Sequence, residues 1–480
     1  MASSAAAAAA ATATLLVIFV ALAVSLSLAA SSPATTVRAG YYLAAAARLR
    51  PLAELDASLY THLYYSALAV HPTTHKLVLP TDPAEAGLLA AFSPALKSKN
   101  PALRTLLSVG TTTTAADIAG ATATDPAFAA MASDPSSRAA FVAAALALAR
   151  DLGFDGLDVA WRFPSSAAEM AHLGFLLSDL RAAAAPPDFL LTATVYFSSH
   201  VLAGVDYPSE AMASGLDWVN VAAFGLRSGA ASANAGATTA FDAPLYDRAT
   251  HFSASYGVVS WIDAGVPEGK VVMGVPLYGR SWFLRNKANH GVGAPVVAAG
   301  PKQRGSNATG VMSYAEVSQL LLSGAGDGRS AVATAAAAYD NASVASYVAV
   351  GDVWVAFDAV AVVAEKLAFA ARRGLLGYFL WPVNYDNANL TVSRTGVDGD
   401  SHSLGSVAAS EVWMQNEMSS SSKNGTGVRQ TQEPVRLPPA TEPAGTPGPV
   451  PAPASGSSAL WLPWTKLDAF LHLAPLILVW

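Results

Sequence analysis

The stretch from Asp155 to Pro164 holds the side chains that are best placed for chemistry in this chain. It reads Asp-Gly-Leu-Asp-Val-Ala-Trp-Arg-Phe-Pro and begins as an apolar run of strand length. Because side chains alternate between the faces of a strand, Asp158, Ala160 and Arg162 share one face. A carboxyl group can donate or accept a proton near its working pH, whereas a guanidinium, with a pKa above about 12, cannot serve as an acid. Acid–base chemistry near this strand would therefore depend on Asp155 or Asp158.

Eight apolar runs of strand length, separated by helical patterns, must position these side chains. Strands that are buried on both faces read as continuous apolar runs, as in a parallel sheet covered by helices. The predicted strands are Val37–Tyr42, His62–Ala69, Leu103–Val109, Gly156–Trp161, Leu190–Val195, Trp218–Phe224, Lys270–Val275 and Leu376–Trp381. Repeated strand–helix units favour an α/β fold, a (β/α)8 TIM barrel with its site at the carboxyl ends of the strands. A doubly wound open sheet is the alternative, although no Gly-x-Gly-x-x-Gly follows a strand.

The helices between the strands carry recognisable start signals. Asp134 is a candidate N-cap, and Pro135 suits the first helical position. This helix is expected to end near Arg150, before Gly153. A second helix is predicted from Ser166 to Ala184.

The interval between the seventh and eighth strands is too long for one crossover connection. It runs from Val275 to Leu376, whereas most connections in compact domains are short. We therefore predict an α+β insertion at about residues 282–353, with a helix within residues 310–322.

Several spaced motifs resemble glycoside hydrolase family 18, and in particular the plant class V chitinases. Residues 155–164 resemble the family signature Asp-x-x-Asp-x-Asp-x-Glu, which an aromatic residue and Pro follow. The other motifs occur in the family's order: Ala39-Gly-Tyr-Tyr42, Thr61-His-Leu-Tyr64, Leu106-Leu-Ser-Val-Gly110, Gly274-Val-Pro-Leu-Tyr-Gly-Arg-Ser-Trp282 and Gly374-Leu-Leu-Gly-Tyr-Phe-Leu-Trp381. The resemblance covers about residues 36–415 and implies a barrel of the chitinase type.

The resemblance also implies that the catalytic motif is degenerate. In this family the substrate's N-acetyl group attacks the anomeric carbon, the Glu protonates the leaving oxygen, and the Asp two residues earlier holds the acetamide. In this chain the Glu position is Arg162 and the Asp position is Ala160. The family's Met-Ala-Tyr-Asp, near the end of the sixth strand, corresponds to Ala222–Gly225, so that Phe224 and Gly225 replace the Tyr and the Asp. We expect a pseudoenzyme.

Aromatic residues at strand ends are candidates for sugar binding, because pyranose faces pack on aromatic rings. Trp381 matches the family's tryptophan at the floor of the cleavage subsite. Tyr42, Tyr278 and Trp282 are candidates to line the mouth, and ordinary core packing is the alternative for each. Arg162 is either a drifted residue, neutralised by Asp158 or Asp155, or a new contact for a sugar or an anion.

The ends of the chain differ in composition from its body. Residues 1–31 resemble a secretory signal peptide, with an apolar run followed by small residues; a retained anchor and a plastid transit peptide are the alternatives. Residues 416–458 form a Ser/Pro-rich stretch that is typical of a disordered linker. Residues 459–480 are apolar and are either a glycolipid (GPI) anchor signal or a tail without function. The predicted location is extracellular or in the cell wall, or on the outer plasma membrane through such an anchor.

Composition restricts the chemistry further. The chain has no cysteine and a net charge of −6, with 13% charged residues, which excludes disulfides and argues against nucleic-acid binding. The histidines form no metal-binding pattern, and we expect neither a metal nor a cofactor. Four Asn-x-Ser/Thr sequons make glycosylation an expectation for a secreted chain, at Asn307, Asn341, Asn389 and Asn424.

These observations leave three functional hypotheses. The first is a non-catalytic binder of chitin or related N-acetylglucosamine glycans. The second is a residual glycosidase that has recruited another carboxylate, Asp155 or Asp158. The third is an interaction protein, such as an inhibitor of another secreted protein, which uses the barrel as a scaffold.

Overall fold

The computed structural model describes residues 36–110, 125–184, 188–201, 204–226, 237–323 and 337–401. The predicted signal peptide, the Ser/Pro-rich linker, the apolar tail and Asn424 lie outside the described residues. None of the helices in the described ranges combines the length and the apolarity that a membrane crossing requires.

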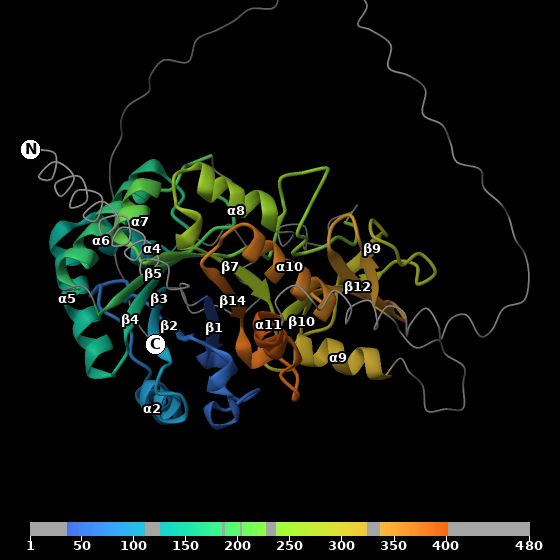
Figure 1. Cartoon of the computed structure of the whole chain (residues 1–480), viewed down its shortest axis with the longest axis horizontal. Coiled ribbons are helices and arrows are strands. Elements are labelled where there is room, and N and C mark those ends of the chain that lie inside the picture. Colours follow the sequence, from blue (N-terminus) through green and yellow to red (C-terminus); the bar gives the residue numbers. More distant parts are fainter. Residues whose placement is uncertain are drawn as a thin grey trace, which may run out of the picture. The chain divides into compact units, whose positions relative to one another are not determined.

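Eight parallel strands close into a barrel, which confirms the predicted (β/α)8 fold (Figure 1). Each strand pairs with the next along the chain, and β1 closes the barrel against β14, with Val37 opposite Gly377. The barrel strands are β1 (Val37–Leu43), β2 (His62–Leu68), β3 (Arg104–Gly110), β4 (Gly156–Ala160), β5 (Leu190–Val195), β6 (Trp218–Val221), β7 (Val271–Pro276) and β14 (Gly377–Trp381).

Helices follow the strands and cover the barrel, and several begin at the caps that the sequence suggests (Figure 1). Asp134 caps the helix after it by accepting a hydrogen bond from the Ser137 amide, with Pro135 at the first helical position, as predicted. The helices are α2 (Pro83–Lys99), α4 (Pro126–Ser133), α5 (Pro135–Asp151), α6 (Ala167–Ala183), α7 (Ser209–Gly215), α8 (Ala254–Asp263), α9 (Tyr314–Ser323), α10 (Val360–Arg372) and α11 (Thr391–Ser401).

The sixth strand is shorter than predicted. We expected Trp218–Phe224, but β6 ends at Val221, and Ala222–Gly225 continue as irregular chain. Residues 222–224 are buried and Gly225 is half-buried. The apolar run therefore reflects burial at the barrel mouth and not strand pairing.

An inserted sheet separates β7 from β14, as predicted, but its boundaries are wider than residues 282–353. Only Leu277 separates β7 from the first inserted strand. The boundary between the barrel and the insertion therefore lies within a continuous apolar run and could not be located from the sequence. The sheet order is β10-β8-β13-β12-β11, with β9 paired to β8. The inserted strands are β8 (Tyr278–Leu284), β9 (Val296–Ala299), β10 (Val311–Ser313), β11 (Ala338–Asp340), β12 (Ala345–Val350) and β13 (Val353–Phe357). The predicted helix within residues 310–322 is α9.

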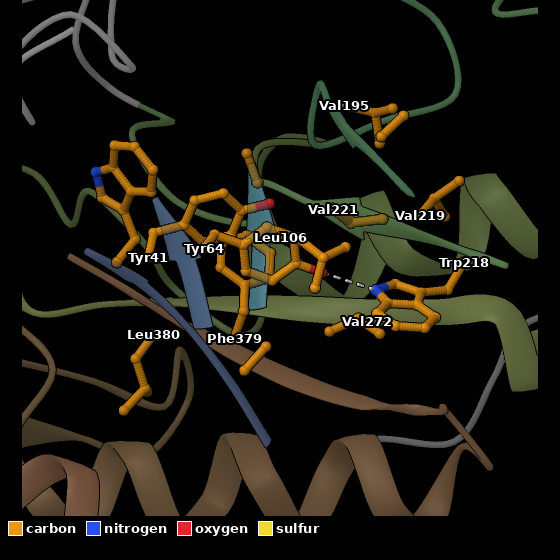
Figure 2. Packing of buried hydrophobic residues seen from close by; sticks show 14 of the residues in the cluster. Tyr41, Tyr64, Leu106, Val195, Trp218, Val219, Val221, Val272, Phe379 and Leu380 are labelled. Atoms are coloured by element: carbon orange, nitrogen blue, oxygen red, sulfur yellow. Dashed lines mark hydrogen bonds between the residues drawn. The ribbon is translucent and has the colours of Figure 1, made fainter. Parts of the chain in front are cut away.

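Aromatic rings fill the barrel interior. The rings of Tyr41 and Tyr64 stack with centroids 4.2 Å apart, and the Trp218 indole donates a hydrogen bond to the Tyr64 hydroxyl (Figure 2). Phe379, on β14, meets Tyr41 edge-on at 5.2 Å. These rings make a packed core beneath the mouth, because such barrels are filled by side chains and are not open pores.

Candidate active site

Strand β4 places Asp158 in the centre of the barrel. Its side chain is fully buried, and its carboxylate accepts hydrogen bonds from four hydroxyl groups, those of Tyr41, Ser108, Thr192 and Thr194, at 2.8–3.1 Å. Burial raises the pKa of Asp158, and these hydroxyl donors oppose the rise. Asp158 therefore organises the barrel core, and no part of it reaches solvent.

Arg162 lies two residues beyond the end of β4 and packs against Trp381. Its guanidinium carbon is 5.5 Å from the centroid of the Trp381 ring, within the range of a cation–π contact. Both residues are buried, with 6% of Arg162 and 2% of Trp381 exposed. The cation thus covers the aromatic face that the resemblance assigns to a sugar.

Arg162 makes no ion pair or hydrogen bond with Asp155 or Asp158 within the part of the chain that the structure describes, which corrects the predicted neutralisation. Asp155 precedes β4 and lies at the opposite end of the barrel from the mouth, where its amide donates to the Thr105 carbonyl. Its carboxylate pairs with Lys97 at 2.8 Å and with Arg104 at 3.2 Å. Burial alone would raise the pKa of Asp155, but Lys97 and the Thr105 amide hold it below its usual value.

A chain of aromatic contacts forms the floor of the mouth. The Tyr41 ring lies 5.1 Å from Trp381, and Phe379 links Tyr41 to Phe224, whose ring is 5.9 Å from that of Phe379. Phe224 in turn meets Tyr278 edge-on at 6.2 Å. The indole nitrogen of Trp381 is buried and donates no hydrogen bond to any of the described residues.

Phe224 and Gly225 occupy the positions where the family resemblance places a tyrosine and an aspartate. Phe224 is buried against Phe379 and offers no hydroxyl group. Gly225 has a φ of 72°, in the left-handed region that glycine adopts without strain. The backbone at residue 225 therefore favours glycine over any residue that has a side chain.

Tyr42 does not line the mouth, which corrects one of the predicted ligand contacts. It points outward from the barrel, where its ring packs 5.7 Å from Phe92 of α2 and its hydroxyl donates to the Arg50 carbonyl. Burial raises the pKa of Tyr42 to about 12. The neighbouring Tyr41 points inward instead. The sequence did not indicate this, because two adjacent tyrosines do not reveal which one faces the interior.

Tyr278 and Trp282 lie on the same strand, β8, but have different surroundings. Tyr278 contacts Phe224 at the mouth, and burial together with the carboxylate of Asp242 raises its pKa well above the usual value. Trp282 is 2% exposed and packs 5.5 Å from Trp354 in a separate hydrophobic cluster of the insertion. Core packing thus describes Trp282, and the prediction that it lines the mouth is wrong.

The mouth also contains a polar pair that the sequence analysis did not select. The Nε of Arg280 lies 3.5 Å from the carboxylate of Asp242, and both side chains are buried. The guanidinium of Arg280 also lies 6.0 Å from the ring of Tyr278. No pattern in the sequence marked Asp242, because it is isolated from the other motifs.

Among the described residues, neither of the carboxylates that the sequence suggested as proton donors is open at the mouth. Asp158 is enclosed, and Asp155 lies at the other end of the barrel. Arg162 stands where the family resemblance places the acid. The residues of the described ranges contain no group of three or more His, Asp or Glu side chains that could hold a metal ion.

The family model for glycosyl hydrolases family 18 matches residues 37–386, which includes all eight barrel strands and the insertion. This chain belongs to glycosyl hydrolase family 18. Within the family, it is 35% identical over 357 residues to Nod factor hydrolase protein 1 of Medicago truncatula, covering 72% of this chain and 86% of that protein.

Two solved structures of family 18 proteins superpose closely on the chain. A class V chitinase mutant from Nicotiana tobaccum, in complex with NAG4, is 32% identical and has a TM-score of 0.67, covering 76% of this chain and 99% of that one. A chitinase-like agglutinin from Robinia pseudoacacia is 30% identical and has a TM-score of 0.63, with the same coverage. The chain is thus similar both to a protein called a chitinase and to one called an agglutinin.

Proposed function

We propose that this protein is a secreted, chitinase-like carbohydrate-binding protein without hydrolytic activity, which binds chitin or related N-acetylglucosamine glycans. The observation that carries the proposal is the position of Arg162 on Trp381. A cation stands where the family resemblance requires an acid, while the aromatic floor is retained.

The loss of catalysis follows from the chemistry of the replaced side chains. A guanidinium stays protonated at all working pH values and cannot transfer its proton to a leaving oxygen. Ala160 has no group to hold an acetamide, and Phe224 has no hydroxyl group. A residual glycosidase would need another carboxylate at the mouth, and neither Asp155 nor Asp158 is positioned to serve. Asp242 lies near the mouth, but it is buried beside the cation of Arg280.

The carbohydrate partner is supported by the site and by similar proteins. The mouth combines the rings of Trp381 and Tyr278 with the polar groups of Asp242 and Arg280. Such a combination suits sugar rings, which are apolar on one face and polar at the rim. The tobacco chitinase was solved with NAG4, and an agglutinin shares the fold. Secretion is supported by the apolar N-terminal run with its small residues.

Two measurements on the purified full chain test the proposal. Chromatography of chitotetraose products should show no turnover above a buffer blank, and calorimetry should show saturable binding of the same oligosaccharide. Trp381→Phe, which shortens the stacking surface, should weaken that binding if the mouth is the site. Turnover that copurifies with the chain would refute the loss of catalysis, and the absence of any binding heat would refute the carbohydrate partner.

A further inference from the structure

One of the described sequons differs from the others in its local geometry. Asn341 follows strand β11, and an exposed tyrosine, Tyr339, stands two residues before it. The corresponding residue is Gly305 for Asn307 and Asn387 for Asn389. Only Asn341 among the described sequons therefore has an aromatic ring in this position.

The hairpin between β11 and β12 places Asn341 directly after the strand that carries Tyr339. Tyr339 pairs with Ser346, and Asp340 pairs with Ala345, so residues 341–344 form the connecting loop. Asn341 is thus the first residue beyond strand β11, and both Asn341 and Tyr339 are exposed. A glycan on Asn341 would therefore begin two residues from an exposed aromatic ring.

The loop that carries Asn341 is held in one conformation. The Ser343 amide donates to the Asp340 carboxylate at 2.7 Å, and the Tyr246 amide donates to the Ser343 carbonyl at 3.1 Å. Val344 has a φ of 48°, which produces the tight turn back into β12. Because these contacts already hold the loop, little conformational entropy of the loop is lost when another group packs against it.

The side chain of Tyr339 is exposed to solvent, next to the loop that carries Asn341. Tyr339 is 36% exposed, and Tyr246, whose amide holds the loop, is 37% exposed. Asn341 itself is exposed, as its modification would require. Aromatic rings supply apolar area with directional contacts, and the apolar face of a pyranose ring complements such a surface.

We propose that an N-linked glycan on Asn341 packs its first N-acetylglucosamine on the ring of Tyr339 and thereby stabilises the inserted sheet. The inference rests on passage through the secretory pathway and is independent of what the barrel mouth binds. The proposal also distinguishes Asn341 from the other described sequons. Glycans on Asn307 and Asn389 would have no aromatic partner two residues before the asparagine and would extend into solvent.

A double-mutant cycle tests the contact. The full chain is directed by an added leader into the secretory pathway of cells that make high-mannose glycans, and peptide mass spectrometry measures occupancy at each sequon. Melting temperatures are then compared for the parent protein, Tyr339→Ala, Asn341→Gln and the double variant. We expect Tyr339→Ala to lower the Tm by about 2 °C more in the glycosylated protein than in the Asn341→Gln background.

Two controls make the test specific. Asn389→Gln should leave the effect of Tyr339→Ala unchanged, because its glycan lies elsewhere. Trimming with an endoglycosidase that leaves one N-acetylglucosamine should preserve the additional loss of Tm, whereas complete removal should abolish it. Equal effects of Tyr339→Ala with and without the glycan would overturn the proposal. So would an unmodified Asn341, whether or not the other sequons carry glycans.

Discussion

The guanidinium of Arg162 packs on the indole of Trp381, with 5.5 Å between the guanidinium carbon and the ring centroid. Since only 2% of Trp381 is exposed, a pyranose ring can reach the indole face only if Arg162 moves away. A buried cation–π contact is worth about 2 kcal/mol, so this displacement sets a cost for any ligand at the centre of the mouth.

Arg162→Ala should therefore tighten the binding of chitotetraose. Removal of the cation exposes the indole face, and recovery of about 1.4 kcal/mol would lower the Kd roughly tenfold. Calorimetry on the purified chain measures the change. Arg104→Ala is the matched control, because Arg104 is exposed at the opposite end of the barrel. Weaker binding by Arg162→Ala would instead identify the guanidinium as a direct ligand contact.

Gly225→Asp should fail to restore activity and should destabilise the fold. An L-residue in the left-handed region costs about 1–2 kcal/mol, and Gly225 has a φ of 72°. Chemical denaturation measures the loss in the free energy of unfolding. Gly225→Ala should show a similar loss, because the cost arises from the backbone and not from the carboxylate. A neutral effect of both substitutions would show that the turn adapts to a side chain.

The free energy of unfolding should depend on pH through Asp158. Because burial raises the pKa of Asp158 in the folded state, its contribution to stability is complete below the unfolded pKa of about 3.9 and is lost as pH rises through the folded value. Relative to Asp158→Asn, the wild-type chain should therefore become less stable as pH increases above about 4.

Asp155→Asn provides a control of opposite sign for the same titration. The pKa of Asp155 is lowered in the folded state, so its contribution is present above about pH 3.9 and is lost as pH falls through the folded value. Urea denaturation at several pH values measures both differences. A wild-type stability that rises with pH relative to Asp158→Asn would show that the hydroxyl donors outweigh burial.

Lys366→Met should be strongly destabilising. Lys366, on α10, is fully buried and forms an ion pair with Asp358, and its ammonium also donates to the Ala243 carbonyl at 2.6 Å. Removal of one partner leaves a buried charge unpaired, at a cost of about 3–5 kcal/mol. The double variant Lys366→Met with Asp358→Leu should recover most of that loss in guanidinium denaturation. If the double variant were as unstable as the single one, packing and not the charge would be the cause.

The sequence by itself determined the barrel and the residue types that stand at the motif positions. The apolar runs located all eight barrel strands, because strands that are buried on both faces must be continuously apolar. Together with the family resemblance, the residue types of Arg162, Ala160 and Phe224 also led to the prediction that the acid and the acetamide contacts are missing, since what a side chain can donate depends on its type.

Only the tertiary structure decided which side chains meet at the mouth. Tyr41 faces the interior and Tyr42 the exterior, Trp282 belongs to the core of the insertion, and Asp155 lies at the far end of the barrel. These differences depend on strand phase and on contacts between residues that are far apart in the sequence. A residue pattern fixes what a side chain can do, whereas the packing of distant elements fixes where it lies.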